Sequence, residues 1–253
     1  MANNFIANNS PQKTLSGRLN NIVQFSTELR WLVGFFYFSG WQEVYQNLKK
    51  NPEIRIRLLV GLQVGQHLSR IFEHDGQDVD LSSDDYFQDF MTSLGYAINN
   101  ENQDTRAFYD QVHFFLDMIQ EGRLIIRKTK EPNHAKLYLF EVNEAEYLKH
   151  NLQGYLITGS SNLTRSGLRS QQEFNVEIKD YGYTEAVAYF EDLWETAVPI
   201  TEMNDRREML VDFILHRSQA ALVQPFEAYA FILKTFLDLH TQKKLKPQVE
   251  RFL

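Results

Sequence analysis

Two apolar segments separated by a helical segment limit the fold of this chain more than any other feature. Residues 29–38 read LRWLVGFFYF, and this aromatic and β-branched content is typical of a buried strand. Residues 41–50 place their apolar side chains on one helical face, and residues 54–60 form a second strand-like segment. Two strands that are joined through a helix usually pair in parallel. The sequence therefore predicts a strand–helix–strand unit of the α/β kind.

The rest of the chain continues this alternation and then changes character after Pro199. Helices are predicted at residues 84–94, 105–120 and 184–196, and strands at residues 124–127, 134–140, 154–158 and 174–178. Beyond Pro199 only helical patterns occur, at residues 206–219 and 225–240. We therefore expect an α/β fold, a mixed β-sheet flanked by helices, over residues 14–198. A helical extension with a basic, linker-like tail is expected over residues 199–253.

Composition excludes several classes of protein. The chain has no cysteine, which excludes disulfides, thiolate zinc sites and a cysteine nucleophile. The most apolar stretch, residues 31–38, is too short to cross a membrane, and no signal peptide is visible. We expect a soluble, cytoplasmic protein in which only residues 1–12 form a loose polar leader.

A small set of polar side chains carries the chemistry. His134 and Lys136 lie two positions apart in a predicted strand, so both should point to one face, about 7 Å apart. A later strand ends in Gly159-Ser160-Ser161-Asn162. The glycine permits a tight turn, and Ser160 and Asn162 offer hydrogen-bonding groups near a turn that can hold an oxyanion. Glu173 follows just before another strand.

These residues resemble the motif of the phospholipase D superfamily. That motif is a His-x-Lys strand, an acidic residue five positions after the lysine, and a Gly-Ser-x-Asn turn. Here Glu141 occupies the acidic position, where the family usually has Asp, and it is expected to support the site rather than react. Glu173 matches the later glutamate of the family's nucleases. The segments GSSNLTRSGL and EFNVEI look like those of single-motif nucleases and of the N-terminal domains of some bacterial helicases.

The family's active site needs two such motifs, and none of the other six histidines of this chain is followed by a lysine two residues later. The resemblance therefore implies a homodimer with the site on its twofold axis. It also implies that His134 attacks phosphorus and forms a phosphohistidine, while a second His134 from the partner chain protonates the leaving oxygen. Lys136, Ser160 and Asn162 would bind the phosphate, and Glu173 would orient His134. No metal and no cofactor are expected.

Basic residues before and after the motif suggest a polyanionic substrate. Lys128, Lys130, Arg165 and Arg169 could line a groove for nucleic acid, although the formal net charge of −7 argues mildly against a general nucleic-acid coat. DNA is the preferred substrate class. A phospholipid is the alternative, but no segment combines lysines on one face with Trp or Leu on the other.

Other interpretations of the motif remain open. The chain could be a catalytically silent, dimeric DNA-binding module. Glu177 and Lys179 resemble half of a metal-dependent nuclease motif, without a partner carboxylate on an upstream strand. The acidic residues Asp84, Asp85 and Asp89 are more typical of a helix N-terminus than of a metal site.

The C-terminal tail predicts a connection to more chain. Residues 243–247 read KKLKP, and the apolar residues that follow, Val249, Phe252 and Leu253, have nothing evident to pack against. Relatives of the single-motif kind are often fused to a DEAD/DEAH-like helicase. We expect the chain to be the N-terminal part of such a protein or to act beside a DNA translocase, with residues 199–240 as a docking element. An ordinary C-terminus is the alternative.

Overall fold

The computed structural model describes residues 4–61, 82–99, 106–179 and 181–218, together with five residues between 229 and 237. The chain divides into two units, Met1–Gln219 and Ala220–Leu253. The second unit contains Tyr229, Leu233, Lys234, Phe236 and Leu237, which are helical and exposed. Most of the helix predicted at residues 225–240, and the basic tail, lie outside the described residues.

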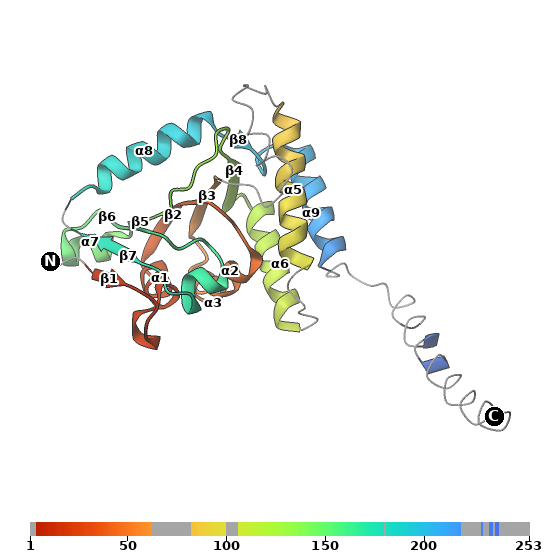
Figure 1. The fold of residues 1–253 in the computed structure, drawn as a ribbon, viewed down its shortest axis with the longest axis horizontal. Coiled ribbons are helices and arrows are strands. Elements are labelled where there is room, and N and C mark those ends of the chain that lie inside the picture. Colours follow the sequence, from red (N-terminus) through yellow and green to blue (C-terminus); the bar gives the residue numbers. More distant parts are fainter. Residues whose placement is uncertain are drawn as a thin grey trace. The chain divides into compact units, whose positions relative to one another are not determined.

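An eight-stranded mixed sheet forms the centre of the first unit (Figure 1). Its strand order is β1-β7-β6-β5-β2-β3-β4-β8. The strands are β1 (Asn4–Ile6), β2 (Ser26–Val33), β3 (Arg55–Val60), β4 (Leu124–Lys128), β5 (Leu137–Val142), β6 (Gly154–Gly159), β7 (Asn175–Ile178) and β8 (Val198–Pro199). β2, β3 and β4 run parallel to one another, as the strand–helix–strand pattern predicts, and the remaining pairs are antiparallel.

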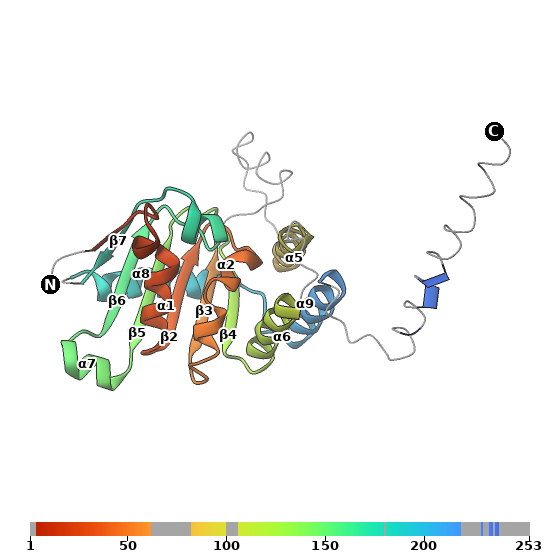
Figure 2. The same cartoon turned by 90° about the horizontal axis from the view of Figure 1, so that it is seen from below.

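Helices cover both faces of this sheet (Figure 2). One face carries α1 (Leu15–Val23), α2 (Phe38–Gln42) and α3 (Tyr45–Leu48), and the opposite face carries α8 (Tyr183–Thr196). α5 (Ser83–Asn99), α6 (Arg106–Gln120) and α9 (Asn204–Arg217) pack together beside β4. Shorter elements are the 3₁₀ helix η1 (Pro11–Lys13), α7 (Glu144–His150) and the π-helix η2 (Ser166–Ser170). The predicted α/β class, with a helical region after the sheet, is confirmed.

Several boundaries differ from the sequence prediction. The polar leader is not loose throughout, because Asn4–Ile6 pairs with β7 at the edge of the sheet. The helix predicted at residues 41–50 is instead two short helices, α2 and α3. The N-terminal one includes Gly40, where a Cβ atom would clash with the backbone of Leu163. This close approach fixes the start of the helical segment against the loop that follows β6.

The alternation of β2 and β5 builds two separate hydrophobic layers. On the α1 side, Trp31 packs edge-on against Tyr138 and Phe140, with ring centroids 5.6 and 6.0 Å apart. The α8 side is lined by aliphatic and aromatic residues: Leu32, Leu59, Leu137, Leu139, Leu156, Phe190, Trp194 and Ala197. Because both faces of the sheet are buried, the strands need apolar side chains on both faces.

A buried ion pair connects helix α1 to strand β7. The Arg18 guanidinium donates to both oxygens of Glu177, with N–O distances of 2.8 and 2.5 Å. Glu177 is completely buried, and Lys179 and Asn4 approach the same carboxylate at 3.7 and 3.4 Å. Breaking a buried ion pair on one side leaves a charge that water cannot solvate.

We predict that Arg18→Met lowers the free energy of unfolding by about 3 kcal/mol, because it removes the principal partner of the buried Glu177. Urea denaturation measures this change. Arg55→Met is the matched control, since Arg55 lies exposed on β3, and its effect should stay within about 0.5 kcal/mol. Equal urea midpoints for Arg18→Met and wild type would contradict the proposed importance of the pair.

Candidate active site

The register between β5 and β6 brings the two predicted motif segments together. Leu137 of β5 pairs with Thr158 of β6, so Lys136, just before β5, lies beside the end of β6 at Gly159. The Thr158 hydroxyl donates to the backbone carbonyl of Lys136 at 2.9 Å. The candidate site therefore lies where one strand begins and its antiparallel neighbour ends.

His134 and Lys136 precede β5 and are not part of it, contrary to the prediction of a strand from residue 134. The backbone N–H of Asn133 donates to Gly61 at 3.0 Å, and the Asn133 side chain accepts from Ala135 at 2.8 Å. These bonds hold the segment in a non-strand conformation. The His134 side chain is exposed, and the Lys136 ammonium donates to the His134 backbone carbonyl. The lysine thus folds back over the residue that carries the imidazole.

Gly159 and Ser160 form a tight turn against the segment that precedes β7. A Cβ atom at Gly159 would clash with the carbonyl oxygen of Phe174, so only glycine fits. The Ser160 N–H donates to that carbonyl at 3.1 Å, and the Phe174 N–H donates to the Ser160 hydroxyl at 3.0 Å. The Ser160 hydroxyl in turn donates to the Glu173 carboxylate.

Sequence reasoning did not single out Ser161 and Asn175, which support this turn from below. Both are fully buried, and the Asn175 amide donates to the Ser161 hydroxyl at 2.9 Å. The Ser161 hydroxyl donates to the Gly167 carbonyl at 2.8 Å. A usable signal existed, because Asn175 is a polar residue at an inward-facing position of a short strand.

Asn162 is held by its side-chain oxygen, which accepts from the Phe35 N–H at 3.1 Å. Among the described residues, none accepts a hydrogen bond from the other end of this amide. The Asn162 amide nitrogen therefore remains a donor for an anionic ligand. This hydrogen bond connects the segment after β2 to the turn at residues 159–162 that follows β6.

The charges of Lys136 and Glu173 influence each other. Partial burial lowers the pKa of Lys136, and the negative charge of Glu173 opposes this effect. Burial raises the pKa of the Tyr138 hydroxyl, and the charge of Glu173 adds to this rise. Among the described side chains, no hydrogen bond joins Glu173 to His134, because the carboxylate receives the Ser160 hydroxyl instead. Within one chain the imidazole is therefore not oriented in the predicted way.

Glu141 lies at the far end of β5 from Lys136, opposite Gly154. Its carboxylate accepts from Arg30 at 2.9 Å. Arg30 also contacts Glu191 of α8, which pairs with Arg57 of β3. Glu141 thus belongs to an ion-pair network that ties α8 to the sheet, and its longer side chain is accommodated there.

The basic residues predicted to bind nucleic acid fall into two groups. Arg165 and Arg169 are exposed, and both guanidinium groups approach the nearly buried Glu43 carboxylate, at 3.2 and 3.6 Å. Lys130 is also exposed. Lys128 is different, because only 3% of its surface is exposed and its ammonium donates to the Gly61 carbonyl at 3.2 Å. Lys128 therefore does not line a surface groove, contrary to the prediction.

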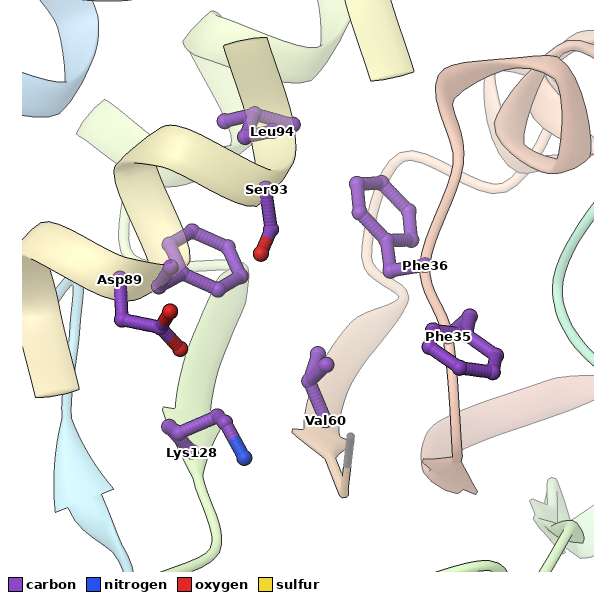
Figure 3. Close-up of a pocket in the computed structure, with 8 residues that line it drawn as sticks. Phe35, Phe36, Val60, Asp89, Ser93, Leu94 and Lys128 are labelled. Carbon is purple, nitrogen blue, oxygen red and sulfur yellow. The ribbon is translucent and has the colours of Figure 1, made fainter. Parts of the chain in front are cut away.

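Lys128 instead shares a small internal cavity with Asp89 (Figure 3). Figure 3 shows Asp89 on α5 and Lys128 on β4 at one side of the cavity, with Phe35 and Phe36 at the other. Burial lowers the pKa of Lys128 to about 8, and the charge of Asp89 partly opposes this shift. Burial raises the pKa of Asp89 to about 6, against the opposing charge of Lys128. One Asp89 oxygen is buried without a hydrogen-bond partner among the described residues.

The alternative metal site is not assembled in the described part of the chain. Glu177 lies on β7, and its carboxylate is already bound by the Arg18 guanidinium. Across residues 4–61, 82–99, 106–179 and 181–218, no group of three or more His, Asp or Glu side chains could hold a metal ion. In the same residues, no helix has the length and apolar content needed to span a bilayer.

Comparison with known proteins assigns the family. The family model described as "Cardiolipin synthase, PLD-like domain" matches residues 33–194, which is more than half of the chain and includes every residue from His134 to Glu173. The chain therefore belongs to the PLD-like family of phosphodiesterases, within the phospholipase D superfamily. A search of curated protein sequences finds no significant match.

Solved structures of this superfamily resemble the chain at low sequence identity. Nuc from Salmonella typhimurium is 11% identical, with a TM-score of 0.40, over 78% of this chain and 97% of Nuc. NucT from Helicobacter pylori is 9% identical, with a TM-score of 0.43, over 78% of this chain and 98% of NucT. Phosphatidylserine synthase from Haemophilus influenzae is 14% identical, with a TM-score of 0.46, over 87% of this chain and 45% of the synthase. Family membership rests on the matched family model.

The raised pKa of Asp89 predicts an unusual pH dependence of stability. A carboxyl group whose pKa is higher in the folded chain than in the unfolded chain binds more protons when folded, so stability falls as pH rises. The window runs from the ordinary pKa of 3.8 to about 6. Asp89→Asn removes this loss, so its free energy of unfolding relative to wild type should increase between pH 4 and pH 6.

Urea denaturation at pH values across this window measures the difference. Asp110→Asn, at an exposed position of α6, controls for the removal of one negative charge. A relative stability of Asp89→Asn that falls as pH rises would contradict the burial of an ionisable Asp89 beside Lys128.

Proposed function

We propose that this protein is a nuclease that hydrolyses phosphodiester bonds of DNA, acts as a homodimer and requires no metal ion. The observation that supports the proposal most strongly is the meeting of Lys136 with Ser160 and Glu173 at adjacent ends of β5 and β6, beside the exposed His134. Together with the Asn162 amide, this set offers a nucleophile, a cation and hydrogen-bond donors for one phosphate. The substrate choice rests on the exposed basic residues Arg165, Arg169 and Lys130 near the motif.

The proposed reaction has two steps. A ring nitrogen of His134 attacks phosphorus, a P–N bond forms, and the bond from phosphorus to the leaving oxygen breaks. A second His134, from the partner chain, gives its proton to that oxygen. The oxygen of a water molecule then attacks phosphorus, a P–O bond forms and the P–N bond breaks, while the second imidazole takes up the proton of the water. This step releases a phosphate monoester and free His134. The Lys136 ammonium neutralises the phosphate oxygens in both steps.

One observation favours a second candidate, a silent dimeric DNA-binding module. Glu173 accepts from Ser160 and does not contact the His134 ring, and the Lys136 ammonium is bonded to a backbone carbonyl. For catalysis the Lys136 ammonium must turn toward the substrate, and the Glu173 carboxylate must turn toward the His134 imidazole. In the nuclease proposal a bound phosphate causes this rearrangement, because it attracts the Lys136 ammonium away from the backbone carbonyl and the Ser160 hydroxyl away from Glu173.

We predict that the wild-type protein cleaves DNA in excess EDTA and that His134→Ala and Lys136→Met each reduce the rate by about 10³-fold or more, since one residue acts covalently and the other neutralises charge. Cleavage of labelled single-stranded and duplex oligonucleotides measures these rates. His150→Ala is the matched control: His150 lies on α7, where it approaches Glu146 at 3.5 Å, and its loss should leave the rate unchanged.

Two results would overturn the nuclease proposal. Near-normal cleavage by His134→Ala would show that His134 is not the nucleophile. Cleavage that is lost in EDTA and restored by Mg²⁺ would show that the site depends on a metal ion. Tight DNA binding by wild type without any cleavage would favour the silent module. Because His134 is exposed, His134→Ala should unfold at the same urea concentration as wild type.

A further inference from the structure

Two exposed phenylalanine rings lie directly beside the candidate phosphate-binding turn. Phe174 is 59% exposed and Phe5 is 58% exposed, and their ring centroids are 5.6 Å apart. Single exposed apolar side chains are common on protein surfaces, but these two rings are in contact with each other and lie beside polar groups, which is typical of a binding surface. Their position is fixed, because Phe5 pairs with Val176 in the β1–β7 ladder.

The Phe174 backbone is hydrogen-bonded to Ser160 in both directions. The Ser160 N–H donates to the Phe174 carbonyl at 3.1 Å, and the Phe174 N–H donates to the Ser160 hydroxyl at 3.0 Å. A phosphate held by Ser160 therefore lies within one nucleotide of the Phe174 ring. The aromatic pair is not a remote patch but an extension of the candidate site.

The surface between the ring and the turn is hollow and polar. A hollow of about 480 Å³ is lined by Ala7, Asn9, Ser160, Gln172, Glu173 and Phe174. Amide side chains such as Asn9 and Gln172 can hydrogen-bond the edges of bases, while an aromatic face can stack on them. An acyl chain would gain nothing from these polar groups. The combination therefore favours a nucleobase over a lipid tail.

We propose that Phe174, backed by Phe5, is a stacking platform for an unpaired nucleobase next to the scissile phosphate, which makes single-stranded DNA the preferred substrate. The inference rests on the proposed nuclease function. In a duplex the bases are stacked on one another and cannot reach a protein ring without being extruded, whereas in a single strand they stack readily on aromatic side chains.

The test compares variants that keep or remove the aromatic face. Phe174→Leu retains an apolar side chain but cannot stack, and Phe174→Tyr retains the ring. Tyr181→Leu is the control, since Tyr181 is 75% exposed and lies outside the hollow. All three are made in the His134→Ala background, and fluorescence anisotropy measures binding of a single-stranded oligonucleotide, the same strand without bases, and a blunt duplex.

We expect Phe174→Leu to weaken binding of the single strand by about 5- to 160-fold, which corresponds to the about 1–3 kcal/mol that one stacked base contributes. Binding of the abasic strand and the duplex should be unchanged, since the loss concerns bases and not phosphates. Phe174→Tyr should bind like the parent, and so should Tyr181→Leu.

Three outcomes would overturn the platform while leaving the nuclease proposal intact. Phe174→Leu could bind the single strand normally, or it could lose affinity equally for the abasic strand. It could also sediment as a monomer where the parent sediments as a dimer, which would make the aromatic pair a contact between copies. Binding of phosphatidylglycerol vesicles that depends on Phe174, in the absence of oligonucleotide binding and of DNA cleavage by wild type, would overturn both proposals.

Discussion

The backbone register between β5 and β6 determines which side chains meet at the candidate site. Leu137 pairs with Thr158, which leaves Lys136 and Gly159 at adjacent strand ends. Successive strand residues point to opposite faces, so a slip of one residue would move every side chain to the other side of the sheet. The buried Leu137, Leu139 and Leu156 on the α8 side prevent such a slip. The hydrophobic core thus positions the polar residues.

Beyond the last paired residues of β6 and β7, side-chain hydrogen bonds hold the turn that follows β6. Asn175 and Ser161 hold it from inside, and the Asn162 side chain connects it to Phe35 at the end of β2. A buried polar pair of this kind is stable only when its members are satisfied. The donors of Ser160 and Asn162 are therefore presented by a rigid loop, although they come from a segment without regular secondary structure.

Much of the fold could be predicted from apolar periodicity, because most strands and helices are long enough to show a pattern. β1 and β8, of three and two residues, could not be predicted, since their partners define them and their own sequences do not. The strand start at Leu137, and not at His134, depends on side-chain bonds of Asn133 and Thr158. The Thr158 bond joins residues that lie 22 positions apart, so no local pattern reveals it.

The site shows the same division between local and distant information. The resemblance to the family motif implied that Lys136 and Ser160 bind one phosphate, and the pairing of β5 with β6 places Lys136 beside Gly159. The burial of Lys128 was missed, because Asp89 and the helix that carries it come from a distant part of the sequence. Likewise, the Glu177–Lys179 pattern gave no indication of Arg18, which lies 159 residues earlier and neutralises Glu177. Charge pairs between distant residues are decided by packing and not by spacing.

The most direct test of the proposed mechanism is to look for the covalent intermediate. Wild-type protein is mixed with cleavable single-stranded DNA, denatured in alkali within the time of one turnover, digested and examined by mass spectrometry. The account predicts a nucleotide joined through phosphorus to the peptide that contains His134, stable in alkali, lost in acid and absent from His134→Ala. Cleavage that proceeds without any adduct on His134, or with an adduct on another residue, would contradict it.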